Sequence, residues 1–385
     1  MRTLNPIKIR PMNLARPALL LFAMSVWATT ARAWEWKDGA YQVYPGDPIQ
    51  EALQAASRNP TGKVVRVHAG TYAPTVRRQA LIWFNRAHDG IRLEAVGDVT
   101  LTAANPALSQ PSSKAHPAVV NHVVYFGDGV SSNTILQGFR ITGANGFLTQ
   151  SGTRQFEPDT SVPKNYFFYS DGGGIKIFGR SYPTIRDVEV VDNYTSPCGA
   201  GISIQHQGFT NEFVRLENCR LLRNRTEATG SAVDLLPGSS AILRNCLFVG
   251  NVSNTGIDTV GALNNGHQFT NSGVLTVFFD SHVVVDGCTF VGNRNAIDDM
   301  GGLGLYRNSI FHQNVRDGGL VPAPRYELDL QKGGRVENCV INGPVIDPGG
   351  AISKTRNRLN APLQLDARYI PVGDGFENVG YRPKP

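Results

Sequence analysis

The chain has 385 residues, with 37 Lys and Arg, 31 Asp and Glu, and five Cys. Five of the basic residues and none of the acidic ones lie in residues 1–33, so the remainder has a net charge of only +1 and gives no reason to expect a nucleic acid partner. No Pro/Ser-rich linker divides this length of chain, which favours one domain.

Residues 1–33 have the pattern of a secretory signal peptide. Basic residues precede an apolar run from Ala18 to Trp27, and Ala31-Arg32-Ala33 offers an A-x-A cleavage site. The run is too short to be a stable membrane anchor, and no second run of spanning length follows. We therefore expect an exported protein, periplasmic or extracellular, whose mature chain has no transmembrane segment.

A short amphipathic helix is predicted in residues 34–62, which otherwise form a lead-in. Asp47 is suited to the N-cap and Pro48 to the first helical position. Apolar residues then recur at helical spacing in Ile49, Ala52, Leu53 and Ala56. The apolar face of such a helix needs a partner, and the open end of a solenoid needs a cover, so we interpret it as an N-terminal cap.

One short pattern recurs along the middle of the chain, at spacings of 21 to 42 residues. In five of six copies, a strand carrying Cys, Val or Ser is followed five residues later by Asn, and in the first copy Asn145 is displaced by one. The copies are LQGFRITGAN (136–145), IRDVEVVDN (185–193), LENCRLLRN (216–224), LRNCLFVGN (243–251), VDGCTFVGN (285–293) and YRNSIFHQN (306–314). Asn tolerates the left-handed backbone conformation, and in-register strands about 4.8 Å apart would stack its amides into a ladder of Asn193, Asn224, Asn251, Asn293 and Asn314.

Four of the cysteines occupy the same place in successive repeats, namely Cys219, Cys246, Cys288 and Cys339. A small apolar thiol suits an inward-facing stack, so we favour a structural role over disulfides, the alternative for an exported chain.

A second alternating strand also repeats, at 175–178, 202–205, 233–236, 275–278, 303–306 and 328–331. Because side chains alternate in direction along a strand, its apolar positions should fill the core, among them Leu303 and Leu305. The predicted fold is all-β: a single-stranded right-handed parallel β-helix over 63–352, with an N-terminal capping α-helix and an irregular C-terminal cover over 353–385.

These repeats resemble the pectin-lyase-like right-handed parallel β-helix superfamily, in particular its exported bacterial repeat proteins. The resemblance rests on VVRVHAGTY after the cap helix, on GGGIKIFGRSYPTIRDVEVVDN and GAGISIQ, and on the closing APLQLDARYIPVGDGFENVG. The family's catalytic motifs are mostly missing: of the galacturonan hydrolase series only Asp298-Asp299 survives, and we expect that pair to be a solvated corner. The resemblance also implies Ca²⁺ as a cofactor if the activity is that of a lyase.

The outward positions of the second strand suggest where a ligand would bind. One column is Lys176, Ser203, Asp234, Thr276, Gly304 and Asp329, and the next is Phe178, Gln205, Leu236, Phe278, Tyr306 and Gln331. Aromatic rings on a solvent face stack on sugars and amides bind hydroxyls. The alternative is that loops pack over these columns and bury them.

Two long insertions, 146–172 and 252–273, precede the strands of Lys176 and Thr276 and would wall a groove between them. Carboxylates paired with Lys or His perform proton transfer, so the catalytic candidates are Asp171, Lys176, Asp234 and His267, with Asp258 nearby. The substrate-binding candidates are Phe178, Gln205, His206, Phe278 and Tyr306.

The first functional hypothesis is an exported protein that binds or processes a polysaccharide along this groove, as a lyase or glycosidase if it is catalytic. The alternative is a non-catalytic structural, adhesion or assembly solenoid that contacts a cell-envelope component. A weaker third hypothesis, a periplasmic metal-maturation factor, is disfavoured by only four Met residues. We expect a monomer.

Overall fold

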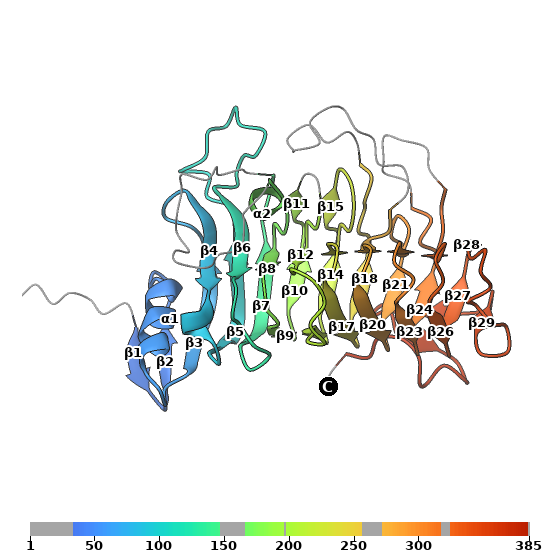
Figure 1. The fold of residues 1–385 in the computed structure, drawn as a ribbon. Helices are drawn as coiled ribbons and strands as arrows, with labels where there is room; N and C mark the ends of the chain where they lie inside the picture. Colours follow the sequence, from blue (N-terminus) through green and yellow to red (C-terminus); the bar gives the residue numbers. More distant parts are fainter. Residues whose placement is uncertain (1–33, 147–165, 196–197, 256–271, 317–323, 384–385) are drawn as a thin grey trace, which may run out of the picture. The chain divides into compact units, whose positions relative to one another are not determined.

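The computed structural model describes residues 34–146, 166–195, 198–255, 272–316 and 324–383. Within them the chain winds into successive coils whose strands pair in parallel with the strands of the coils before and after, as Figure 1 shows. The predicted all-β parallel coil is confirmed.

One side of the coils is a nine-stranded parallel sheet, called here the first face. Its strands, in spatial and chain order, are β4 (Arg78–Phe84), β6 (Val120–Phe126), β8 (Ile175–Phe178), β12 (Ile202–Gln205), β16 (Val233–Leu235), β19 (Leu275–Val277), β22 (Ile297–Asp299), β25 (Leu328–Asp329) and β28 (Val345–Ile346). Alternate residues such as Ile175 and Ile177 point inward and are fully buried, as the alternation predicted.

Most of the remaining strands form the second and third faces, while β11 (Tyr194–Thr195) and β15 (Arg225–Thr226) pair as a separate two-stranded parallel sheet. The second consists of β2 (Ala40–Val43), β3 (Val64–Tyr72), β5 (Arg92–Thr102), β7 (Ile135–Thr142), β9 (Thr184–Arg186), β13 (Val214–Glu217), β17 (Ser240–Arg244), β20 (His282–Asp286), β23 (Leu305–Arg307) and β26 (Arg335–Glu337). The third consists of β10 (Glu189–Val191), β14 (Arg220–Leu222), β18 (Leu247–Val249), β21 (Thr289–Val291), β24 (Ile310–His312), β27 (Val340–Asn342) and β29 (Arg358–Leu359). Strand β7 pairs with both β9 and β10, so the two faces begin as one sheet.

A bend separates the second face from the third, so each strand that the sequence predicted as one is two. The residue at the bend has a positive φ, a conformation that Asn, Asp and Gly adopt most readily. This bend row is Asp187, Asn218, Asn245, Gly287, Asn308 and Asn338, with φ between 50° and 64°. Neighbouring side chains hydrogen-bond along it: the Asn218 amide donates to Asp187 at 3.0 Å and the Asn245 amide to Asn218 at 2.8 Å.

The predicted Asn ladder is present inside the next corner. The side-chain amide of each Asn donates to the side-chain oxygen of the Asn in the following coil, at 3.1 Å for Asn193 and Asn224, 3.0 Å for Asn251 and 2.7 Å for Asn293. The Asn314 side-chain amide donates in turn to the carboxylate of Glu327, which ends the ladder. The left-handed residue is the one before each Asn, such as Asp192 or Gly250, and not the Asn itself as we expected.

All five cysteines are free and buried. Cys219, Cys246, Cys288 and Cys339 follow the bend row and point inward, with at most 1% of their surface exposed. The backbone N–H of Cys246 contacts the sulfur of Cys288 at 3.4 Å, so the thiols stack between coils. The structure thus confirms a structural stack and contains none of the alternative disulfides.

Helix α1 (Ile49–Arg58) covers the first coil and buries Ile49, Ala52, Leu53 and Ala56. It begins one residue later than predicted, with Pro48 at the N-cap. The Asp47 side chain instead accepts a hydrogen bond from the backbone N–H of Tyr44 at 2.9 Å. Strand β1 (Glu35–Lys37) pairs antiparallel with β2 beside the helix.

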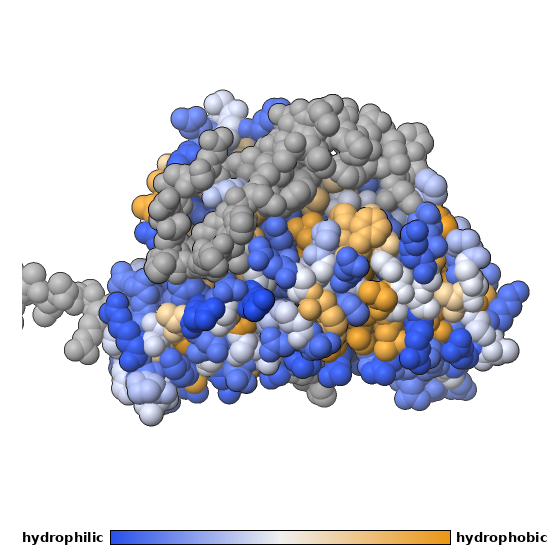
Figure 2. Space-filling model, in the orientation of Figure 1, coloured by the Kyte–Doolittle hydropathy of each residue, from blue (hydrophilic) through white to orange (hydrophobic). Residues whose placement is uncertain are grey.

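The C-terminal segment turns back over the outside of the third face. After β30 (Gln364–Leu365) and β31 (Pro371–Val372), Leu363, Phe376 and Val379 pack against Ile310 and Val340. The residues from Phe376 to Pro383, called here the tail, then run along the bend row. Figure 2 shows apolar surface gathered over the C-terminal coils and mainly hydrophilic surface over the N-terminal coils on the side that it displays.

Candidate functional site

The outward side of the first face carries one continuous column of side chains. The register runs from Trp83 to Tyr125, Lys176, Ser203, Asp234, Thr276, Asp298 and Asp329 on successive strands. The column therefore begins aromatic, passes through one lysine and ends acidic. Every member of this column has at most 9% of its surface exposed. The column is therefore buried, as the alternative in the sequence analysis predicted, and is not open to solvent.

Lys176 lies at the middle of the column with two polar partners. Its Nζ donates to Ser203 Oγ at 3.1 Å and lies 3.8 Å from Asp171 Oδ2, and the Lys176 and Asp171 side chains are fully buried. Burial lowers the pKa of Lys176 to about 8, although Asp171 and Asp234 act in the opposite direction. An amine with such a pKa can exchange a proton near neutral pH.

Asp234 is a completely buried carboxyl two strands beyond Lys176. Burial raises its pKa well above the usual range, and Asp171 raises it further. Neither carboxyl oxygen has a hydrogen bond within the described part of the chain. The Thr229 hydroxyl acts to lower the pKa but is not in hydrogen-bonding geometry.

Glycines in the corner before each strand make room for these side chains. Gly172, Gly199 and Gly230 all have positive φ, and a Cβ on Gly230 would lie 2.3 Å from Asp234 Oδ1. The repeated Gly-rich corner therefore has a steric reason as well as a conformational one.

Asp298 and Asp329 form the acidic end of the column on neighbouring strands β22 and β25. Burial raises the pKa of Asp298 to about 8, and Asp329 and Asp299 add to the shift. Oδ2 of Asp298 has no hydrogen-bond partner among the described residues. Asp234, Asp298 and Asp329 are thus buried carboxyl groups on the outside of the same sheet.

The second predicted column is less uniform. Phe178 is buried against Phe168 of α2 (Tyr166–Ser170), whereas Gln205 and Phe278 are half-buried. His206 is buried, and its Nε2 lies 2.9 Å from the carbonyl oxygen of Ser181. Burial lowers the pKa of His206 to about 4, so this ring is neutral near pH 7.

Several assignments were wrong because one strand was misaligned. The strand of the first face is β22 and not 303–306, so Tyr306 lies on the second face inside the coil, where it is fully buried. Its hydroxyl donates to Asp299 Oδ2 at 2.8 Å. Of the two leucines expected in the core, Leu303 is 49% exposed and Leu305 is half-buried. Asp298 and Asp299 are buried strand residues rather than a solvated corner.

Sequence patterns missed this strand because Asp299 occupies an inward position. The carboxylate there accepts backbone N–H groups of Gly301, Gly302 and Gly304 at 2.8 to 3.1 Å, in addition to the Tyr306 hydroxyl. These bonds compensate a buried charge, but they interrupt the apolar alternation. The sequence did contain one signal for this strand: Ile297 is an apolar residue that precedes Asp298 and is followed by the pair Gly301-Gly302.

The other predicted site residues fall partly outside the described residues. His267 and Asp258 lie there, as do most of both long insertions. The structure brings three of the predicted catalytic residues, Asp171, Lys176 and Asp234, into one buried group. Asp234 lies two strands beyond Lys176 on the first face.

Within the described residues, no group of three or more His, Cys, Asp or Glu side chains is arranged to hold a metal ion. Calcium takes six to eight oxygen ligands, so this part of the chain does not fit the Ca²⁺ that the family resemblance implied.

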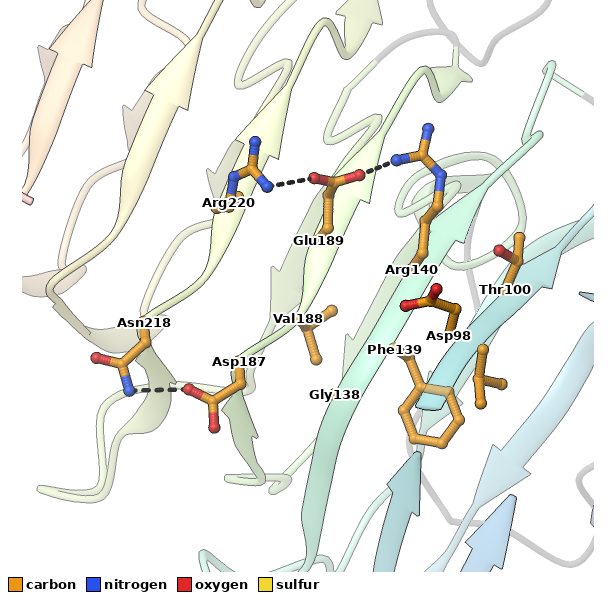
Figure 3. A pocket seen from close by; sticks show the side chains of 11 residues that line it. Asp98, Thr100, Gly138, Phe139, Arg140, Asp187, Val188, Glu189, Asn218 and Arg220 are labelled. Atoms are coloured by element: carbon orange, nitrogen blue, oxygen red, sulfur yellow. Dashed lines mark hydrogen bonds and ion pairs between the residues drawn. The ribbon is translucent and has the colours of Figure 1, made fainter. Parts of the chain in front are cut away.

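Two cavities lie away from the acidic end of the column. One, of about 740 Å³, lies at the aromatic end, beside α1 and the start of β4, and is lined by Trp83, Arg78 and Gln54 among others. The other, about 340 Å³, lies at the bend row of the N-terminal coils and is shown in Figure 3.

Comparison with known proteins agrees with this architecture. The family described as "Right handed beta helix region" matches residues 121–272. With the stacked parallel coils, this confirms the predicted right-handed parallel β-helix and the resemblance to that superfamily. No curated protein matches the chain.

Two solved structures are remotely similar to the chain. The polygalacturonase from Erwinia carotovora ssp. carotovora is 14% identical, with a TM-score of 0.38, over 87% of this chain and 92% of that one. The catalytic domain of a GH87 alpha-1,3-glucanase, solved in complex with tetrasaccharides, is 12% identical, with a TM-score of 0.31, over 83% of this chain and 68% of that one. Similarity this remote carries no conclusion about activity.

Among the described residues, no helix has both the length and the apolar character needed to span a membrane.

Proposed function

We propose that this protein is exported and processes a polysaccharide on its first face, with Asp234 and Asp298 as the acid–base pair. The observation that carries the proposal is that both carboxyl groups lie on one outward column with their pKa values raised by burial. Asp234, which stays protonated near neutral pH, can protonate the leaving oxygen of a glycosidic bond. Asp298, with a pKa of about 8, ionises more readily, and its carboxylate takes the proton of the attacking water. The known activities of remote relatives add only plausibility to this choice.

The spacing of the pair also suits this chemistry. One strand, with Thr276, separates Asp234 from Asp298, so their backbones are about 9 to 10 Å apart at the usual strand spacing. Glycosidases place two carboxyl groups on either side of the bond that they cleave. Lys176 is placed to bind or neutralise an acidic group of the substrate near Asp234.

The test is release of reducing ends from a panel of neutral and acidic polysaccharides. We expect Asp234→Asn and Asp298→Asn each to lower the rate by about 10²-fold to 10⁴-fold, while Asp374→Asn, at an exposed site, leaves it unchanged. If the product instead shows the ultraviolet absorbance of an unsaturated uronide, the reaction is elimination and Lys176 becomes the base to test. No release from any polymer, or equal rates for all variants, contradicts the proposal.

The second candidate is a non-catalytic solenoid of the cell envelope. The specific observation in its favour is the burial of the whole column, since a site that acts on a polymer must admit it. Binding of a polysaccharide without any cleavage, unchanged in Asp234→Asn, would favour this role.

Export is proposed from residues 1–33 alone. Expression of the full chain with and without these residues, followed by fractionation and N-terminal sequencing, tests it. A mature protein beginning at Trp34 supports the proposal, and retention of residues 1–33 contradicts it.

A further inference from the structure

A groove follows the bend row on the outside of the N-terminal coils. This bend groove has a volume of about 340 Å³ and is lined by Asp98, Val99, Thr100, Gly138, Phe139, Arg140, Asp187, Val188, Glu189, Asn218 and Arg220. Figure 3 shows Arg140, Glu189 and Arg220 along one wall and the Asp187–Asn218 pair along the other. Its floor includes the buried Phe139 and Val188.

In the coils that follow, the tail lies against the same row of residues. The backbone N–H of Gly380 donates to the carbonyl of Asn308 at 2.8 Å, and the N–H of Tyr381 donates to Thr289 Oγ1 at 2.9 Å. Arg382 is held from both sides of its backbone, because its N–H donates to Asn245 Oδ1 and its carbonyl accepts from Asn245 Nδ2, each at 2.6 Å. The bend row therefore binds the backbone of the tail through the side-chain amide of Asn245 and the carbonyl of Asn308.

The bend groove continues directly from the point that the tail reaches. Asn218, which lines the groove, is hydrogen-bonded to Asn245, which holds Arg382. Tyr381 lies within electrostatic range of Arg220 and Asp187, both of which line the groove. The tail and the groove thus share one track along the coils.

The outward residues of the third face change character where the tail ends. Under the tail they are Leu247, Thr289, Ile310 and Val340, whereas in the groove they are Arg140, Glu189 and Arg220. Glu189 pairs with both arginines, at 3.0 Å for Arg220. The outward side chains of the third face thus change from apolar to charged between Leu247 and Arg220. The part of an occupant that lies along this wall of the groove must therefore be polar.

The remaining charge in the groove is acidic. With Glu189 shared between two arginines, the other carboxylates that line the groove are those of the exposed Asp98 and the half-buried Asp187. Asp187 also accepts hydrogen bonds from the side-chain amides of Asn218 and Gln137. A basic side chain opposite them would be attracted. The tail itself carries a basic residue here, because Arg382 is among its last described residues and its backbone is bound by Asn245.

We propose that the bend groove is a docking site for an extended, basic segment of a partner polypeptide, which continues along the track that the tail follows. The side-chain amide of Asn218 binds its backbone as Asn245 binds that of Arg382, and Asp98 and Asp187 bind its Lys or Arg side chains. This inference is independent of the function proposed for the first face.

The probe is a fluorescein-labelled peptide with the sequence of residues 376–384, FENVGYRPK, titrated with the full chain and followed by fluorescence anisotropy. We expect saturable binding that weakens as salt is raised. Asp98→Asn and Asp187→Asn should each weaken it about threefold to fivefold, as should replacement of both basic residues of the peptide by Ala.

Asp280→Asn is the matched control. Asp187 and Asp280 both have positive φ, which Asn also adopts, so both variants keep the backbone conformation, but Asp280 lies outside the groove. Binding that is absent, that is equal in the three variants, or that occurs only after residues 376–385 are deleted overturns the proposal. So does binding of an oligogalacturonide in place of the peptide, lost in Arg140→Gln but not in Asp98→Asn.

Discussion

Asn251 shows how much of the fold depends on single side chains of the ladder. Its amide donates to the Leu221 carbonyl at 2.8 Å and to Asn293 Oδ1 at 3.0 Å, and its oxygen accepts from the backbone and side-chain N–H groups of Asn224. All of these groups are buried, so each one left without a partner costs about 1–3 kcal/mol.

We expect Asn251→Ala to lower the free energy of unfolding by about 3–5 kcal/mol, because several buried groups lose partners at once. Urea denaturation measures the change. Asn133→Ala, at an exposed position, is the control and should cost less than about 1 kcal/mol. Equal losses in the two variants would show that the ladder contributes nothing.

Asp298 makes stability depend on pH in a defined direction. Burial raises its pKa from 3.8 to about 8, so the folded state keeps a proton that the unfolded chain releases near pH 4. The resulting stabilisation is complete below pH 4 and is lost as pH rises through 8. Glu327, whose pKa burial raises to about 7, contributes with the same sign.

Relative to the Asp298→Asn variant, the unsubstituted chain should therefore lose on the order of 3 kcal/mol of unfolding free energy between pH 5 and pH 8. Chemical denaturation at the two pH values measures it, with the exposed Asp374→Asn as the control. A profile for Asp298→Asn that parallels the unsubstituted chain would contradict the assignment.

The thiols give a residue-scale test of the core. Because all five are buried, and because burial raises the pKa of Cys198, Cys246 and Cys339, a thiol reagent should label none of them in the native state and all five in urea. The exposed Ser132→Cys should add one fast-reacting thiol. Rapid labelling of the native, unsubstituted chain would mean that the stack is open.

At the scale of the strands, sequence reasoning succeeded where one physical rule acted alone. The inward positions of β8, β12, β16 and β19 follow strict apolar alternation, and the ladder follows a fixed Asn spacing. Sequence reasoning failed at β22, where Asp299 occupies an inward position that is apolar in the other strands. Its carboxylate accepts hydrogen bonds from backbone N–H groups, and residue spacing does not predict such bonds.

The site was accessible to prediction only in part. The repeat placed Lys176, Ser203 and Asp234 correctly in one column, because their strands pair in register. It did not indicate that the column is buried, or that Asp171 and not Asp234 is the ion-pair partner of Lys176. Both depend on segments that pack over the strands, and such contacts leave no periodic pattern.

The tail is an element whose attachment can be tested separately. Phe376 is 8% exposed, packs with Ile310 and Val340, and lies under the Arg358 guanidinium at 5.1 Å. We expect Phe376→Ala to weaken docking of the tail by about 3 kcal/mol, or roughly a hundredfold in its opening equilibrium. Faster hydrogen exchange at Gly380, Tyr381 and Arg382 alone would show this.

The control for the tail is Val372→Ala, at a side chain that is 53% exposed. If Phe376→Ala leaves these three amides as protected as this control does, the tail is held by its hydrogen bonds and not by the aromatic anchor.

At the scale of the whole coil, the N-terminal end is an edge that needs a cover. Leu53 of α1 is fully buried against the first coil, while its neighbour Gln54 is exposed. A charge at Leu53 should detach the helix and expose parallel strands to pairing with other molecules. We therefore expect Leu53→Asp to form oligomers in light scattering, and Gln54→Asp to remain as the unsubstituted chain.

A monodisperse Leu53→Asp with unchanged stability would show that α1 is not needed as a cover.

The Asn ladder has a direction, and this bears on how such a chain can change its length. Each side chain donates toward the next coil, and only Glu327, which accepts without donating, ends the series. Every coil between Asn193 and Asn314 presents the same acceptor on one side and the same donor on the other. Gene duplication or loss of a complete coil, such as the 27-residue step from Asn224 to Asn251, would leave both ends matched. Insertions of a fraction of a coil would not, so whole coils are the units in which this protein can lengthen or shorten during evolution.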